Sequence, residues 1–155
     1  MGIVRVIEGD ARAGKRRSGG KRMKTLEDFL GDWDLHREIH HDDGTRARFE
    51  GLARWRREGQ GAICDERGEL ILPQGRFVSE KRTVWTTDLA VHFADGRFFH
   101  QVPPEGGAAG HWCDPDQYDF TYDFGDWPRW SVTCHVAGPR KAYRMTSHYA
   151  PMRTD

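Results

Sequence analysis

The sequence predicts an all-β fold: an up-and-down antiparallel β-barrel of eight to ten strands, preceded by one short helix. Three observations support this prediction. Apolar and polar residues alternate along most of the chain from residue 33 onward, short turn sequences separate the alternating stretches, and no second long helical pattern follows. A meander of this kind removes its exposed edges when it closes into a barrel, and a small barrel can hold one ligand.

Composition and charge limit the classes of protein to consider. A chain of 155 residues fits one domain, and its 12% aromatic content argues against disorder. Residues 1–24 hold eight Lys and Arg residues but only two acidic ones. Subtracting these from the 24 basic and 24 acidic residues of the whole chain leaves 16 and 22 in residues 25–155, a net charge of −6. We do not expect a domain with this net negative charge to bind nucleic acid.

Cysteine usage and hydropathy indicate the cellular compartment in which the protein is expected. Cys64, Cys113 and Cys134 are odd in number and irregularly spaced, which is typical of reduced thiols rather than of a disulfide framework. No apolar run is long enough to span a membrane, and the first residues contain no secretory h-region. We therefore expect a cytoplasmic protein of bacterial type with no membrane association.

Residues 1–22 are rich in Gly, Arg and Lys and lack a sustained period. One interpretation is a basic arm for nucleic acid or acidic lipid. The favoured one is a disordered, solvated extension, upstream of a start at Met23, because basic clusters of this kind are commonly solvated tails. The predicted domain then covers residues 23–155.

The predicted helix spans residues 25–30. Thr25 and Asp28 stand at the spacing of a capping box, and Gly31 ends the helix. From Trp33 the period becomes two, and a loop at residues 42–44 predicts a hairpin. The register of this hairpin follows from its loop and places three pairs opposite each other: Ile39 and Ala47, Arg37 and Phe49, Leu35 and Gly51.

Two further hairpins bring candidate functional residues into the barrel. Residues 61–72 and 76–85 pair around a turn at 73–75, in a register that sets Glu66 opposite Arg82 and turns Cys64, Leu70, Val78 and Val84 to the same face. The other face, with Ile63, Ile71, Phe77 and Trp85, is also partly apolar. The Asp95-Gly96 turn pairs Phe93 with Phe98 and Val91 with His100, with all four on the inner face.

The C-terminal third alternates in the same way. Tyr118, Phe120, Tyr122 and Phe124 share one face, and Trp130, Val132, Cys134 and Val136 meet Lys141, Tyr143, Met145 and Ser147 across a turn at residues 137–140.

Two resemblances follow from these residues. The patterns Phe93-x-Asp95-Gly96-Arg97-x-Phe99-His100, His111-x-Cys113-x-x-Asp116-x-Tyr118 and Gly138-Pro139-Arg140-Lys141-x-Tyr143 resemble an uncharacterised bacterial family, a domain of unknown function, over residues 27–150. That resemblance implies no activity.

The second resemblance is more distant. Gly31-x-Trp33 at the head of a barrel is similar to the calycins, which include lipocalins, fatty-acid-binding proteins and nitrobindins. Likeness to lipocalins implies an arginine packed across Trp33, for which Arg144 and Arg153 are candidates. Likeness to nitrobindins implies a haem-ligating histidine near the C-terminus, where His148 matches by position alone. The chain lacks the alternating glycines of a nitrobindin first strand.

The predicted inner faces carry an unusual number of polar groups. They are Arg37, Arg82, His100, Lys141 and Tyr143, with Glu66, His111 and Tyr118 as further candidates. Cations inside a small barrel must be paired or must meet an anion. We therefore predict that the interior binds a small amphipathic molecule bearing a carboxylate or phosphate. The alternative is a filled core with an internal ion-pair network, such as Glu66 with Arg82.

In the predicted complex the acidic group lies near Arg37, Arg82 and Tyr143, because an arginine fork and a tyrosine hydroxyl suit a carboxylate. The apolar part contacts Phe49, Phe93, Phe98 and Met145. His100 orients the ligand, or transfers a proton if the protein is an enzyme.

Other functions stay open. An isomerase or hydrolase would use His100 with Tyr118 or Tyr143, and a haem protein would use His100, His111 or His148. No cofactor and no metal are expected, because Cys134 and His135 point to opposite faces and no Cys-x-x-Cys pair exists. An interaction protein would need Trp55, Trp85 and Trp127 on one outer patch. A homodimer is also an open alternative.

Overall fold

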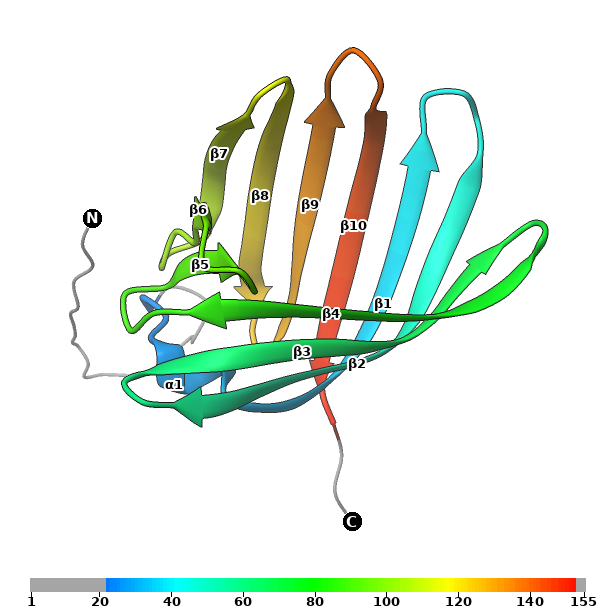
Figure 1. Cartoon of the computed structure of the whole chain (residues 1–155). Coiled ribbons are helices and arrows are strands. Elements are labelled where there is room, and N and C mark those ends of the chain that lie inside the picture. The colour runs from blue at the N-terminus through cyan, green and yellow to red at the C-terminus, as the bar shows by residue number, and fades with distance from the viewer. Residues whose placement is uncertain (1–21, 153–155) are drawn as a thin grey trace.

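A computed structural model describes residues 22–152 of the chain (Figure 1). The extension predicted for residues 1–22 therefore lies outside the described residues, apart from Arg22. One helix and ten strands are present: α1 Leu26–Phe29, β1 Gly31–His41, β2 Arg46–Glu58, β3 Gly61–Leu72, β4 Gly75–Trp85, β5 Ala90–Phe93, β6 Phe98–Gln101, β7 Gly107–Cys113, β8 Asp116–Asp126, β9 Arg129–Ala137 and β10 Ala142–Pro151.

The strands form one antiparallel sheet in the order β6-β5-β4-β3-β2-β1-β10-β9-β8-β7. Neighbours in sequence pair with each other, and β1 also pairs with β10, so the sheet curls into a nearly closed barrel (Figure 1). The remaining seam lies between β6 and β7. Side chains cross it, with the rings of Phe98 and Phe99 centred 6.0 and 5.8 Å from that of His111. The predicted fold class is confirmed.

Helix α1 closes one end of the barrel. The N–H of Thr25 donates to the Asp28 carboxylate at 2.8 Å, as the predicted capping box requires. Phe29, with 0% exposure, contacts a cluster of rings contributed by four strands and by the β8–β9 turn. These rings are Trp55, Trp85, Phe124, Trp127 and Trp130. This end of the barrel is therefore filled by aromatic side chains.

Trp33 belongs to the same cluster. Its indole N–H donates to the carbonyl of Phe29 at 2.7 Å. The cation over these tryptophans comes from Lys24, whose Nζ lies 4.6 Å from the ring centroid of Trp127. Arg144 does not pack across Trp33, because it is an exposed residue on the outward face of β10. Arg153 lies outside the described residues.

The β1–β2 register agrees with the prediction: Ile39 faces Ala47, and Arg37 faces Phe49. Next to it, Gly51 on β2 faces Gly68 on β3. A Cβ on Gly68 would lie 2.2 Å from the carbonyl oxygen of Glu50, which is shorter than any contact a real side chain makes. The two backbones can approach this closely only because both residues are glycine.

The predicted register of β3 and β4 is wrong by one residue. A tight turn joins Leu72 to Gly75, so Glu66 faces Lys81 and Asp65 faces Arg82. A shift of one residue turns every side chain of β4 to the other face. Trp85 and Lys81 therefore point inward, and Val78 and Arg82 point outward. The burial of Trp85 in the aromatic cluster favours this arrangement over the burial of Val84.

The β5–β6 hairpin contains a bulge. Val91 faces His100 as predicted, but the register then shifts and Phe98 faces His92. Phe98 is consequently 49% exposed, and the prediction that it faces inward is wrong. Phe99 occupies the inner face in its place, with its ring stacked on Phe93 at 4.4 Å.

The end of the barrel opposite α1 is open to water. Inward-facing residues near this end stay accessible: Phe77 on β4 is 48% exposed, and Lys81 and His41 are also exposed. Within the described residues, no helix is long and apolar enough to cross a membrane.

Candidate functional site

The interior carries a saturated ion pair at mid-depth. The guanidinium of Arg37 donates to both carboxylate oxygens of Glu66, at 3.0 and 3.1 Å, and its Nε donates to Ser147 Oγ at 2.6 Å. Tyr149 Oη donates to the same carboxylate at 3.4 Å. Both charged side chains are only 11% exposed. Arg37 thus has its partners within the protein and is not free to bind a ligand anion.

The electrostatics of this pair involve a second cation. Burial opposes the ionisation of Glu66, but the charges of Lys81 and then Arg37 hold its pKa below the ordinary value of 4.5. For Arg37, the favourable field of Glu66 outweighs burial, so its pKa is raised. Both groups are therefore charged at neutral pH.

Lys81 is this second cation, and it lies within the barrel. Lys81 faces Glu66 across β3 and β4, and its positive charge favours the ionised form of that carboxylate. Lys81 lies on the same face of β4 as the buried residues Thr83 and Trp85, so its side chain points into the barrel. No hydrogen bond or ion pair joins Lys81 to another described residue. Arg37 and Lys81 together exceed Glu66 by one positive charge.

His100 lies deeper and is only 4% exposed. Its Nε2 is 2.7 Å from the hydroxyl of Tyr122, and its ring stacks on Phe120 at 3.8 Å. Within the described residues its Nδ1 has no partner. Burial, followed by the charges of Lys81 and His111, lowers the pKa of His100 to about 3. The imidazole is therefore neutral at physiological pH.

Four ring-bearing residues and Val136 form one cross-strand row near the open end. His111, Tyr118, Val136, Tyr143 and His41 are successive cross-strand neighbours on β7, β8, β9, β10 and β1. Lys141 caps this row at the rim, where its Nζ lies 3.4 Å from Tyr118 Oη and 3.5 Å from the Asp116 carboxylate. Partial burial raises the pKa of Tyr143, with a smaller contribution from Tyr118.

Most of the predicted ligand-binding residues do face the interior. Arg37, His100, His111, Tyr118 and Tyr143 are inside, and Lys141 is at the rim. Arg82 is not: it lies on the outer surface and donates to Asp65 at 2.7 and 3.0 Å. The expected Glu66–Arg82 pair is replaced by Glu66–Arg37.

Lys81 is a functional candidate that was not among the residues predicted from the sequence. The turn at residues 73–75 leaves the orientation of Lys81 open, because either two or three residues can close it. A two-residue turn at Pro73 and Gln74 sets Leu72 opposite Gly75, which brings Lys81 and Trp85 to one face. The predicted pairing of His100 with Tyr118 or Tyr143 is also replaced, because Tyr122 is the partner of His100.

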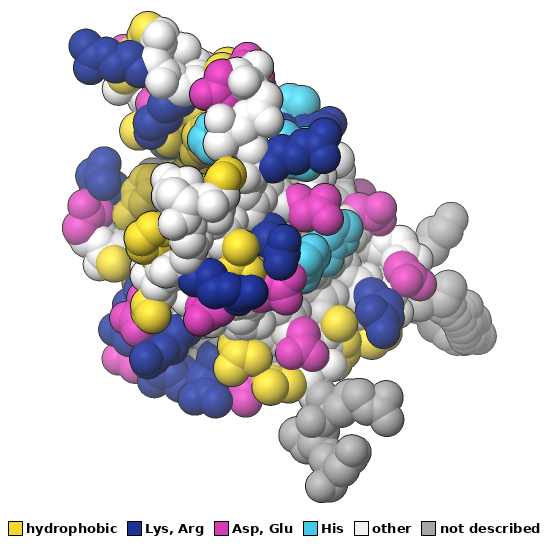
Figure 2. Space-filling model, turned by 90° about the vertical axis from the view of Figure 1, so that its right-hand side faces the viewer, with side chains coloured by type: hydrophobic (Ala, Val, Ile, Leu, Met, Phe, Trp, Pro, Cys, Tyr) yellow, Lys and Arg dark blue, Asp and Glu magenta, His cyan; other side chains and the backbone are white. Residues whose placement is uncertain are grey.

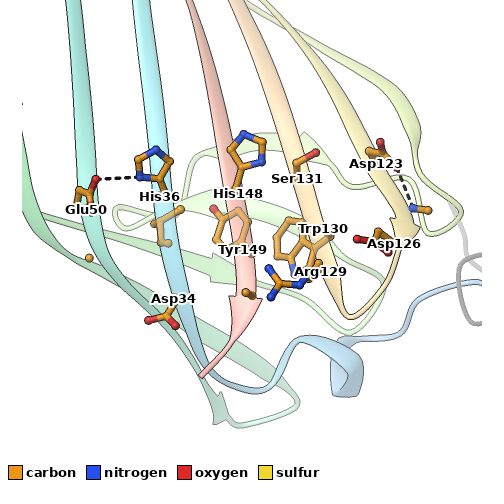
Figure 3. A pocket seen from close by; sticks show the side chains of 14 residues that line it. Asp34, His36, Glu50, Asp123, Asp126, Arg129, Trp130, Ser131, His148 and Tyr149 are labelled. Atoms are coloured by element: carbon orange, nitrogen blue, oxygen red, sulfur yellow. Dashed lines mark hydrogen bonds and ion pairs between the residues drawn. The ribbon is translucent and has the colours of Figure 1, made fainter. Parts of the chain in front are cut away.

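A separate groove runs over the outside of the barrel (Figure 3). One cross-strand row spans it, from Glu50 through His36, His148 and Ser131 to Asp123. Glu50 lies 3.1 Å from Nδ1 of His36. His148 thus faces outward and does not enter the barrel, and among the described residues no three His, Cys, Asp or Glu side chains converge on a metal position.

The outer surface is mixed in charge. Figure 2 shows acidic, basic and histidine side chains interspersed on one face of the molecule. Trp55, Trp85 and Trp127 form no outer patch, because they pack in or against the aromatic core. Trp112 is the exposed tryptophan of the described residues.

Comparison with known proteins agrees with this architecture. A family model described as a family of unknown function (DUF6314) matches residues 29–151. No curated protein matches the sequence. Among solved structures, the S-type phycobiliprotein lyase CPES from Guillardia theta is similar, with a TM-score of 0.61 and 8% sequence identity, over 84% of this chain and 92% of the lyase chain. At that identity the likeness is one of fold alone.

Proposed function

This chain belongs to DUF6314, a family of unknown function, and we propose that its barrel binds a small amphipathic molecule whose carboxylate or phosphate lies against Lys81. The ligand enters through the open end. Its apolar part contacts the inward-facing side chains between Lys81 and the rim.

The position of Lys81 supports this proposal most directly. Its amine faces the interior and lacks a hydrogen bond or ion pair to any described residue, whereas the nearby cation Arg37 is fully engaged by Glu66 and Ser147. Lys81 is exposed to water at the open end, and its ammonium can form a charge-assisted hydrogen bond with an incoming acid group. A ligand acid would supply the negative charge that the interior lacks.

The apolar side chains of the inner wall support the second part of the proposal, which is that the ligand also has an apolar part. Leu70, Phe93 and Met145 are partly buried and pack on the core from the inner face, and Ile39 is a partly buried inner residue of β1. A ligand that covers such side chains gains roughly 25 cal/mol for each Å² of apolar surface removed from water. Phe99 takes the contact role predicted for Phe98, because the bulge in β6 exchanges the two rings.

Binding is favoured over catalysis by the state of His100. An acid or base at neutral pH needs a pKa near 7 and access to the substrate. His100 is neutral, buried under Phe99 and Phe120, and hydrogen-bonded to another buried group, Tyr122. Its role in this proposal is to form part of the wall beside the ligand.

The test is calorimetric titration of the full chain with 2-naphthoate and with undecanoate, each compared with its primary alcohol. A charge-assisted hydrogen bond contributes about 1.5–3 kcal/mol, so Lys81→Gln should weaken acid binding by roughly 10- to 150-fold and leave the weak binding of the alcohols unchanged.

Arg82→Gln is the matched control, because Arg82 is the next residue on the same strand and points to solvent. It should change the affinity by less than about twofold, since its exposed pair contributes little. The proposal fails if neither acid binds, or if the two variants bind the acids equally well. Native mass spectrometry of protein purified from cells should also show a retained acid that Lys81→Gln loses.

A further inference from the structure

The rings near the open end indicate more about the ligand than its charge. We infer that the apolar part is a flat, conjugated ring system that stacks on the row formed by His111, Tyr118, Tyr143 and His41. This inference rests on the proposed function and specifies the class of molecule: a planar aromatic acid rather than an alkyl acid.

The first observation is the continuity of this row. His111 faces Tyr118, Tyr118 and Tyr143 both face Val136, and Tyr143 faces His41. Four of these five consecutive inner positions thus carry a planar ring. Val136, the exception, is only 2% exposed, so its neighbours cover it and the wall has no gap at that point.

The second observation is that the two tyrosines are braced. Tyr118 has ring contacts with Phe99 at 5.5 Å and with His111 at 6.3 Å, and Tyr143 contacts His41 at 5.5 Å. Lys141 lies 6.0 Å from the ring centroid of Tyr118 on the rim side. A braced ring loses little conformational entropy when a ligand stacks on it, so its face is a prepared surface.

The third observation is that these rings remain accessible. His111, Tyr118 and Tyr143 are partly exposed, although they point into the barrel, and His41 is exposed. The rings of the closed end, by contrast, are buried against one another and around Phe29. The row near the open end can therefore add a ring from outside, whereas the rings around Phe29 cannot.

The fourth observation sets the direction of the ligand. Below the ring row lie smaller or aliphatic inner residues, Ala109, Cys134, Met145 and Ile39, together with Phe120. Next to Ile39 on the inner face of β1 lies Arg37, which binds Glu66, and Glu66 faces Lys81 across β3 and β4. A planar acid stacked on the rings can thus direct its acidic group inward, toward Lys81. Offset stacking on such rings contributes beyond the buried area alone, whereas an alkyl chain gains only the area term.

The experiment compares 2-naphthoate with undecanoate, which has the same number of carbon atoms, on the wild type and on Tyr118→Leu and Tyr143→Leu. Leucine keeps an apolar side chain but removes the flat face. Each variant should weaken 2-naphthoate by about three- to tenfold and change undecanoate by less than twofold. Tyr118→Phe and Tyr143→Phe, which keep the ring, should bind 2-naphthoate within twofold of the wild type.

The outcomes separate the two proposals. If undecanoate binds and depends on Lys81, but the leucine variants weaken both acids equally or neither acid, the planar-ligand inference is overturned and the anion-binding function stands. If neither acid binds the wild type, the proposed function itself fails. Circular dichroism of each variant identifies a loss of binding that comes from unfolding, and the phenylalanine variants then decide the question.

Discussion

At the scale of single residues, the two cations of the interior have different surroundings. Arg37 is held by two bonds to Glu66 and one to Ser147, so its role is structural. Lys81 shares the same space without such partners. A buried ion pair adds little net stability, but its disruption leaves one buried charge uncompensated. The two residues should therefore respond differently to substitution.

Arg37→Leu should lower the free energy of unfolding by about 3–5 kcal/mol, because it leaves the Glu66 carboxylate buried without its main partner. Urea denaturation measures this change. Arg54→Leu, which breaks an exposed pair with Asp32, should cost less than about 1 kcal/mol. The double variant Arg37→Leu/Glu66→Leu should recover most of the loss. If Arg37→Leu and Arg54→Leu lowered the free energy of unfolding equally, the structural role of Arg37 would be contradicted.

His100 makes the stability depend on pH. Its pKa is about 3 in the folded protein against an ordinary 6.5. Between these values the unfolded state takes up a proton that the folded state does not. The free energy of unfolding should therefore fall as the pH is lowered from 6.5, by about 1.4 kcal/mol per pH unit from this group. Glu66, whose folded pKa is below 4.5, adds a further loss only below about pH 4.5.

Denaturation at pH 7, 6 and 5 measures this dependence while Glu66 stays ionised in both states. His100→Gln should reduce the slope of the free energy of unfolding against pH by about 1.4 kcal/mol per pH unit. His135 is an exposed histidine on the outer face, and His135→Gln should leave the slope unchanged. A wild-type slope that His100→Gln does not reduce would show that another group is responsible.

At the scale of elements, β2 and β3 approach each other unusually closely at one point. Gly51 and Gly68 face each other there, and the backbones are too close for any side chain. The same two strands carry Phe49 and Glu66, which contact Arg37. The close approach of the two strands therefore also helps to position the Arg37–Glu66 ion pair.

Gly68→Ala should destabilise the protein by at least about 2 kcal/mol, because its Cβ would overlap the backbone of Glu50 and Gly51, which cannot rotate away. Thermal unfolding measures the effect. Gly110→Ala on β7 is the control, since its Cβ would meet side-chain atoms at an ordinary 3.5 Å. Similar melting temperatures for the two variants would mean that β2 and β3 can separate freely.

At the scale of the whole molecule, the barrel has two ends with different roles. The end closed by α1 is filled by aromatic rings around Phe29, and the other end admits water to Lys81 and the ring row. The ring contacts of Phe29 include no residue of the ring row. The stability supplied by the closed end and binding at the open end should therefore be separable by substitution.

Phe29→Ala should cost about 3–5 kcal/mol, the usual effect of removing a buried phenylalanine, and should change the affinity for 2-naphthoate by less than twofold. Lys81→Gln should do the reverse. Calorimetric titration and urea denaturation of both variants test this separation, and Phe29→Leu, which leaves a smaller cavity, serves if Phe29→Ala does not fold. A Phe29 variant that remains folded but loses binding would contradict it.

The sequence by itself determined the all-β barrel, the short capped helix and the pairing of β1 with β2. Each of these follows from local signals: a period of two, a capping box, and a turn whose length sets the register. The inward positions of Arg37, Tyr118 and Tyr143 follow from the same alternation. In these stretches one face is clearly more apolar, so only one register buries it.

Only the tertiary structure decided the register of β4, the bulge in β6 and the identity of the inner cation. Both faces of β4 are partly apolar, so the alternation cannot choose between burying Val84 and burying Trp85. The choice depends on the partners of Trp85, namely Phe29 and Trp55, which come from distant parts of the chain. Their packing turns Lys81 inward and Arg82 outward, and local patterns in the sequence hold no record of such long-range contacts.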